Sequence, residues 1–268
     1  MNSYYDFASQ ILLGENLEDK FSDFSFEWKT WKKFDLPAHP GRGGKLVFSK
    51  TQLKFPKPKS LNEMDKKAIA LHSFANHELL AIEMMASALL IYPHSNDEDL
   101  RFKKGIYSAL KDEQKHLGLY IKRLNELGYE FGDFPLNDFF WRQMPKLETP
   151  SQYLAVMALT LESANLDFAQ FYSRIFHDLG DTKTADILNI VLQDEISHVA
   201  FGGHWMKRWR QNKDLWQYYN DSLPWPMTPA RGKGIGYDPE LHLKAVGDSD
   251  FVKSLSEYND DFMVTRRN

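Results

Sequence analysis

Two short stretches of the chain combine a carboxylate and an imidazole at a spacing that suits metal binding. Residues 112–116 read Asp-Glu-Gln-Lys-His and residues 194–198 read Asp-Glu-Ile-Ser-His, so both follow the pattern Asp-Glu-x-x-His. Residues three apart share one face of a helix, which lets the glutamate and the histidine of each copy bind one ion. A single copy is equally typical of a solvated helix face, and the repetition is what favours a metal site. The candidate ligands in the two copies are Glu113, His116, Glu195 and His198.

Each copy is preceded by a further glutamate in an apolar stretch, Glu78 in the first case and Glu162 in the second. Glu78 lies 35 residues before Glu113, and Glu162 lies 33 residues before Glu195. The sequence therefore predicts two similar helical hairpins related by a pseudo-twofold axis. An ionised carboxylate in a helix-bundle core is costly unless it is paired or bound to metal, and two divalent cations balance four such charges. The alternative is that these glutamates lie on the surface.

Glu83 competes with Glu78 for the place of the first ligand. If the first hairpin turns at Asn96, Glu78 lies 18 residues before the turn and Glu113 lies 17 residues after it, so the two distances nearly match. Glu83 lies only 13 residues before the turn, a mismatch of about 6 Å along antiparallel helices. Glu78 is therefore predicted as the ligand. Glu83, like Asp167 at the corresponding position five residues after Glu162, is predicted to support the site or the fold.

The aspartate that opens each pattern suggests how the histidines are held. A metal-bound histidine usually donates its second ring N–H to a carboxylate. We expect a crossed pairing, in which Asp112 accepts from His198 and Asp194 accepts from His116. The alternative is that both are ordinary exposed aspartates.

These residues require long helices to position them. Helices are predicted over residues 60–92, 95–128, 149–180 and 181–212, joined by short, long and short connections. Short connections force antiparallel neighbours, and one long crossover (129–148) between two hairpins gives an all-α, ferritin-like four-helix bundle. The predicted N-terminal caps, which include three capping boxes, are Ser60 with Glu63, Ser95 with Glu98, Thr149 with Gln152, and Asp181.

The remaining residues are predicted to flank the bundle. Residues 1–59, punctuated by glycine and proline, read as an irregular arm packed on the core. Residues 60–212 form the bundle, and residues 213–268 form a tail with short helices around 239–246 and 249–258. Within the tail, Gly232-Lys233-Gly234 is expected to be a flexible turn.

Composition excludes several kinds of protein. The 268 residues contain no cysteine, which excludes disulfides, cysteine zinc sites, iron–sulfur clusters and thiol nucleophiles. A net charge of -4 does not favour binding to nucleic acid, although a local basic patch remains open. The longest apolar stretch, residues 79–92, contains Glu83 and is too short to span a bilayer. The first residues lack the layout of a secretion signal. We therefore expect a cytoplasmic protein without membrane contact.

With these motifs in place, the chain resembles the ferritin-like superfamily of carboxylate-bridged dimetal proteins over about residues 60–212. It resembles more closely a bacterial ferritin-like family of unknown function. That closer resemblance rests on residues 77–83 (HELLAIE), 137–141 (NDFFW), 161–167 (LESANLD), 194–202 (DEISHVAFG) and 229–234 (PARGKG). It implies a dimetal site held by Glu78, Glu113, His116, Glu162, Glu195 and His198, and it implies no particular reaction.

Carboxylate-rich sites with one imidazole per metal suit iron or manganese. The leading hypothesis is a diiron oxidase or oxygenase that activates O2 and acts on an unidentified small molecule, with two Fe ions as cofactors. Mn/Fe and Mn/Mn centres, and an external electron donor, stay open. The alternative is a ferroxidase, storage or peroxide-protective protein with no organic substrate. A third hypothesis is a helical scaffold without metal. A monomer or dimer is expected for the enzyme, and a large cage for a storage protein.

Overall fold

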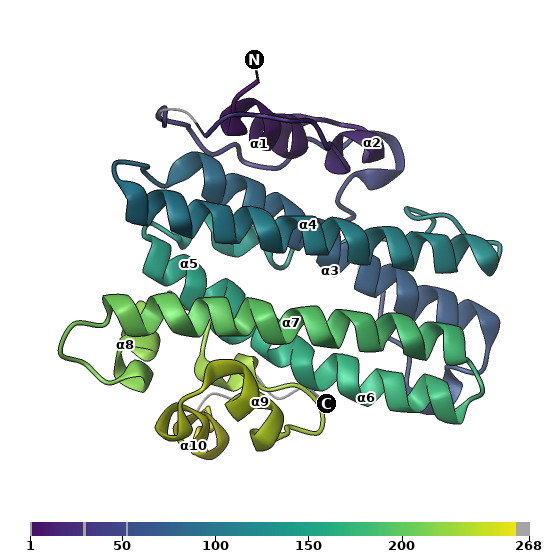
Figure 1. Cartoon of the computed structure of the whole chain (residues 1–268). Helices are drawn as coiled ribbons and strands as arrows, with labels where there is room; N and C mark the ends of the chain where they lie inside the picture. The colour runs from purple at the N-terminus through teal and green to yellow at the C-terminus, as the bar shows by residue number, and fades with distance from the viewer. Residues whose placement is uncertain (1, 29–30, 52, 261–268) are drawn as a thin grey trace. The chain divides into compact units, whose positions relative to one another are not determined.

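The computed structural model describes residues 2–28, 31–51 and 53–260, and these residues form an all-α protein with ten α-helices. Among them the only β pairing consists of two isolated bridges, Ser3 with Glu27 and Phe48 with Leu136. The predicted all-α helical bundle class is confirmed. The chain divides into two compact units, Met1–Pro145 and Lys146–Asn268, each built around one helical hairpin (Figure 1). The predicted arm thus belongs to the first unit and the predicted tail to the second.

The first unit is built on the antiparallel helices α3 (Met64–Ile91) and α4 (Asp97–Glu126), covered by the short helices α1 (Tyr4–Leu13) and α2 (Leu17–Lys20). By length and composition α3 is apolar enough to cross a bilayer, but 89% of its apolar window is buried inside the structure. A helix that is apolar on all sides and buried is typical of the core of a globular protein. We therefore assign α3 as the core helix of this unit.

The second unit begins with α5 (Pro150–Val156), which continues through a π-helical segment (Met157–Glu162) into α6 (Ser163–Asp178). Helix α7 (Thr182–Trp209) returns alongside α6. Two shorter helices, α8 (Leu215–Ser222) and α9 (Pro239–Val246), pack on this hairpin. A third, α10 (Ser249–Glu257), packs on α8 and α9. The two predicted tail helices are confirmed, and α8, capped by Asp214, was not predicted.

Two of the predicted helix caps are wrong. Ser60 lies in a short 3-10 turn (Pro58–Ser60), and α3 begins only after Glu63, whose side chain makes no capping hydrogen bond. The cap of α4 is Asn96 rather than Ser95, because the Asn96 side chain accepts the backbone N–H groups of Glu98 and Asp99 at 2.8 and 2.9 Å. At α4 the residue next to the predicted serine takes the cap, whereas at α3 the predicted cap residue lies in the turn that precedes the helix.

The two caps predicted for the second hairpin are confirmed. Thr149 and Gln152 form a reciprocal capping box at the start of α5, with Pro150 in the first turn. Asp181 caps α7 by accepting the backbone N–H of Thr184 at 3.1 Å. Gly180 adopts a left-handed φ of 79°, which ends α6 and lets α7 turn back along it.

Residues 1–59 contain two helices, so the prediction of an irregular arm is wrong in part. Ser3 and Asp6 form a capping box at the start of α1. Beyond the helices, Trp28 stacks on Tyr4 with ring centroids 5.3 Å apart and meets Phe26 edge-on at 5.2 Å. The segment is therefore part of the core of the first unit, which explains its many aromatic residues.

A buried lysine closes the C-terminal end of α3. Lys103 donates from Nζ to the carbonyl of Leu89 at 2.7 Å, and Trp31 Nε1 donates to the carbonyl of Leu90 at 2.7 Å. Both carbonyls belong to the last turn of α3, where no helical partner follows. Lys103 is fully buried, and this burial lowers the pKa of its ammonium group to about 7.

Lys103→Met should therefore flatten the dependence of stability on pH. Between about pH 7 and pH 10 the unfolded wild type keeps a proton on Lys103 that the folded protein loses, so its free energy of unfolding rises with pH. In the variant this rise should be about 3–4 kcal/mol smaller, as measured by urea denaturation at several pH values. The exposed neighbour Lys104, changed to Met, is the matched control. Equal slopes in wild type and Lys103→Met would contradict the assignment.

Candidate metal centre

The first unit holds one compact group of metal-ligating side chains, formed by Glu78 of α3 and by Glu113 and His116 of α4. All three residues are buried, and each offers a ligand atom within 4.8 Å of the others. His116 Nδ1 lies 3.6 Å from Glu78 Oε2 and 3.6 Å from Glu113 Oε2. The structure thus brings together the three residues predicted for the first hairpin.

The electrostatics of this group favour a cation. Burial raises the pKa of Glu78 well above its usual range, and the neighbouring Glu113 carboxylate raises it further. A hydrogen bond from His116 acts in the opposite direction but does not reverse the shift. Two buried carboxylates side by side are costly when both are ionised, and one divalent cation balances their charge. The donor set of two carboxylates and one imidazole therefore fits a bound metal.

The second unit holds a matching group. Glu162, at the end of the π segment, and Glu195 and His198 of α7 are buried and offer ligand atoms within 4.8 Å of one another. His198 Nδ1 lies 3.4 Å from Glu195 Oε2. The other Glu195 oxygen, Oε1, accepts a hydrogen bond of 2.8 Å from the Asn165 side chain. Sequence reasoning did not assign a role to Asn165, although it lies one turn after Glu162 on the same helix.

The π-helical segment that ends at Glu162 was not predicted either. Each π turn holds more residues than an α turn, so the segment changes the direction in which Glu162 leaves the helix. Thr160 Oγ donates to the Ala155 carbonyl at 2.7 Å, which satisfies an acceptor within this irregular stretch. A Cβ on Gly202 would lie 2.3 Å from the Ala158 Cβ. Glycine at this position of α7 therefore allows α7 to pack closely against the segment that carries Glu162.

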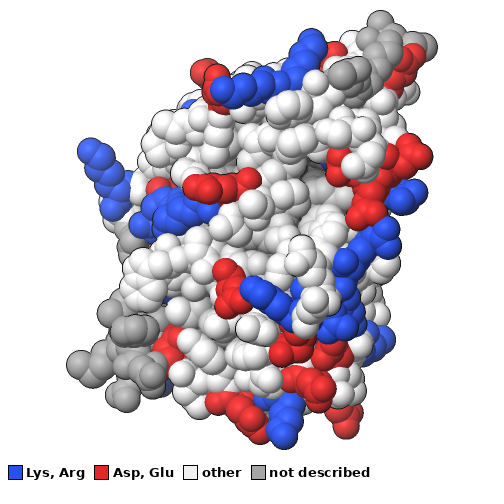
Figure 2. All heavy atoms as spheres, turned by 90° about the vertical axis from the view of Figure 1, so that its left-hand side faces the viewer, with Lys and Arg blue, Asp and Glu red and all other residues white. Residues whose placement is uncertain are grey.

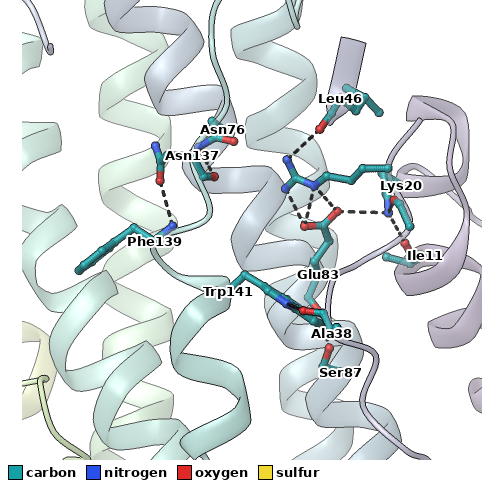
Figure 3. A network of polar contacts seen from close by, with 12 residues as sticks. Ile11, Lys20, Ala38, Leu46, Asn76, Glu83, Ser87, Asn137, Phe139 and Trp141 are labelled. Atoms are coloured by element: carbon teal, nitrogen blue, oxygen red, sulfur yellow. Dashed lines mark hydrogen bonds and ion pairs between the residues drawn. The ribbon is translucent and has the colours of Figure 1, made fainter. Parts of the chain in front are cut away.

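Glu83 is engaged in ion pairs with the N-terminal part of the first unit (Figure 3). Arg42 donates from Nη2 to Glu83 Oε2 at 2.6 Å and from Nε to Oε1 at 3.0 Å, and Lys20 Nζ lies 3.2 Å from Oε1. Lys20 also donates to the carbonyls of Ile11 and Gly41, at 2.9 and 2.7 Å. Glu83 thus serves to hold the segment before α3 onto that helix, which agrees with the structural role offered for it.

Asp167 occupies a comparable place in the second unit. Its Oδ2 accepts the backbone N–H of Gly234 at 2.8 Å and lies 3.1 Å from His242 Nε2, and its Oδ1 accepts the N–H of Asp238 at 3.0 Å. A Cβ on Gly234 would lie 2.6 Å from the Ala164 carbonyl oxygen. The stretch around Gly234 is therefore a close packing contact, and the expectation of a flexible turn there is wrong.

Asp112 and Asp194 are both half-buried. Asp112 Oδ1 lies 3.6 Å from Lys115 Nζ, one turn further along α4. The crossed pairing of these aspartates with His198 and His116 joins residues of different units, and it stays a prediction.

Figure 2 shows the distribution of charged side chains on one face of the protein. Among the residues described there, lysine and arginine alternate with aspartate and glutamate, and no continuous basic area is seen.

Comparison with known proteins gives a family but no activity. The model of the family described as "Protein of unknown function (DUF455)" matches residues 8–241. An "Uncharacterized protein" of Haemophilus influenzae is 29% identical over 143 residues, which is 52% of this chain and 50% of that relative. The chain therefore spans about half the length of the curated relative it matches. No solved structure matches the chain.

Proposed function

The chain belongs to the DUF455 family, and from this premise we propose that it is a dimetal-carboxylate protein that binds two iron ions. The observation that carries the proposal is the repetition of one buried donor set, two glutamates and a histidine, on the hairpin of each unit. Each set has two negative charges that one divalent cation balances. Its mixture of hard oxygen donors with a single imidazole suits iron or manganese.

We further propose that the two hairpins pair as a ferritin-like bundle, so that both donor sets form one centre. Support comes from the antiparallel hairpins α3/α4 and α6/α7, and from the long connection between them, residues 127–149. In such bundles, a glutamate from each of two helices joins a Glu-x-x-His motif from each of the other two. Glu113 and Glu195 would then serve both ions, whereas Glu78, Glu162, His116 and His198 would each serve one.

The reaction class that we propose is the oxidation of a small organic molecule, for which two bound iron ions would supply the redox chemistry with O2. The protein side chains hold the ions in a site from which bulk water is excluded, since all six ligands are buried. Asn165 donates to Glu195 and thereby fixes the orientation of that carboxylate. The proposal also requires an external electron donor and a supply of Fe(II).

Anaerobic loading with Fe(II), followed by O2, tests this function. After removal of free metal, we expect about two Fe per chain by elemental analysis, as the two donor sets require. Exposure to O2 should consume the gas and raise the near-ultraviolet absorbance as iron is oxidised. Protein loaded with redox-inert Zn(II) is the matched control and should consume no O2. A chain that retains no iron contradicts the proposal.

The size of the iron-loaded protein distinguishes an iron enzyme from an iron-storage protein. A monomer or dimer on gel filtration that retains about two Fe per chain supports an enzyme. A cage-sized particle that accumulates many Fe per chain would instead support iron storage.

A further inference from the structure

A buried chain of three side chains links the C-terminal segment to the helix that carries Glu162. His242 Nε2 lies 3.1 Å from Asp167 Oδ2, and His242 Nδ1 lies 3.2 Å from Ser163 Oγ. Ser163 Oγ also donates to the carbonyl of Gly232 at 3.1 Å. Because an ionised carboxylate only accepts, the hydrogen on Nε2 points to Asp167, and Nδ1 is left as an acceptor that faces the Ser163 hydroxyl. The single hydrogen of that hydroxyl can be donated to Nδ1 or to the Gly232 carbonyl, so each ring nitrogen of His242 has a polar partner.

The same three residue types form the nucleophilic triad of many hydrolases, but this set is not arranged for that chemistry. Ser163 and His242 are 0% exposed and Asp167 is 1% exposed. The Ser163 hydroxyl is also held by the Gly232 carbonyl, whereas a nucleophile must face a substrate carbonyl. The chain of hydrogen bonds is therefore a positioning element rather than a reactive one.

Its place in the helix indicates what it positions. Ser163 is the first residue after the π segment, and the residue before it is Glu162, a candidate ligand. The direction of Glu162 depends on where the π turn ends, since an α-helical turn in its place would rotate the side chain. A hydrogen bond to Ser163, anchored through His242 to Asp167 one turn further on, fixes that point from outside the helix.

We propose that Ser163, His242 and Asp167 are positioning residues that hold Glu162 in the orientation needed to bind its metal. The inference rests on the proposed function, because it assigns these residues to a metal ligand. The first unit offers a parallel, since Glu83 lies five residues after Glu78 and is likewise held by the segment that flanks the hairpin. In both units, the acidic residue five positions after the proposed ligand binds the segment that flanks the hairpin.

Titration with Co(II) alone, followed by visible absorption, tests the inference in the full chain. Two variants break the same link from opposite sides. Ser163→Ala removes the hydroxyl, and His242→Gln keeps a donor near the Nε2 position while it loses the group that faces Ser163. In each variant we expect one of the two Co(II) ions to bind about 10–100-fold more weakly, with an altered absorption band, while the other ion binds as in wild type. The double variant should be no weaker than either single one, because both act on one link.

Ser87→Ala is the matched control. Ser87 also has a buried hydroxyl that donates to a helix carbonyl, that of Glu83, at 2.8 Å, but it lies in the first unit. Ser87→Ala and Ser163→Ala should lower the melting temperature of the metal-free protein by similar amounts, and only Ser163→Ala should weaken Co(II) binding. Wild-type affinity for both ions in Ser163→Ala and His242→Gln overturns the inference. A wild type that binds no Co(II) overturns the proposed function itself, and the inference falls with it.

Discussion

Glu83→Gln should destabilise the metal-free protein by about 3–5 kcal/mol, the cost of removing one partner from a buried ion pair. Lys20 and Glu83 are 0% exposed and the Arg42 side chain is 2% exposed, so neither cation regains water when the carboxylate is lost. Burial already lowers the pKa of Lys20, and Glu83 is the group that opposes this shift most. The loss is a large part of the stability of an ordinary domain. Urea denaturation followed by circular dichroism measures it.

Glu78→Gln is an unusually close control for this measurement. Glu78 lies on the same helix, five residues earlier, and is also buried, but the groups that shift its pKa are the Glu113 carboxylate and His116 rather than lysine or arginine. Removal of its charge relieves repulsion between carboxylates, so the metal-free variant should be as stable as wild type or more stable by about 1 kcal/mol. Equal destabilisation by both changes would show that the two glutamates do not differ in role.

The contrast between these two glutamates also shows what the sequence does and does not reveal. Distance from the hairpin turn favours Glu78 over Glu83 as a ligand, because antiparallel helices keep partners at similar heights. The ion pairs of Glu83 with Lys20 and Arg42 were beyond prediction. They join Glu83 of α3 to Arg42 and Lys20, which lie 41 and 63 positions earlier in the chain. The segment that holds these two residues has no periodic pattern.

Regular helices were predictable because their signals are local. The Thr149 capping box, Gly180 and the Asp181 cap place the start of each helix of the second hairpin to within one residue. The π segment is different. Its backbone hydrogen bonds join residues five positions apart, and the amino-acid types at 157–162 do not indicate this pattern. The residues that contact the π segment and the residue after it lie elsewhere in the chain, and they include Gly202 of α7 and, at Ser163, Gly232 and His242. For the same reason, the orientation of Glu162 was not predictable from its own helix.

Glu113→Gln should reduce retained iron from about two Fe per chain to nearly none, and this result distinguishes one dimetal centre from two separate sites. If Glu113 bridges both ions, its loss removes a ligand from each position. If the donor sets act separately, the variant keeps the ion of the second unit and retains about one Fe. Glu195→Gln should give the reciprocal result. The control is Glu126→Gln, which changes an exposed glutamate of the same helix α4 that is paired with Arg123 at 2.7 Å.

Thermal unfolding tests the role of Glu113 as a metal ligand in a second way. This measurement does not require the bound metal to be recovered and counted. A ligand that binds only the folded state stabilises it by RT ln(1 + [L]/Kd), about 2.7 kcal/mol at one hundred times Kd. Mn(II) should therefore raise the melting temperature of wild type and of Glu126→Gln, and should leave that of Glu113→Gln nearly unchanged. Without metal, Glu113→Gln should be no less stable than wild type, since it removes one of two crowded buried carboxylates. A metal-dependent rise of wild-type size in Glu113→Gln would show that this residue is not a ligand, whatever its place beside Glu78 and His116.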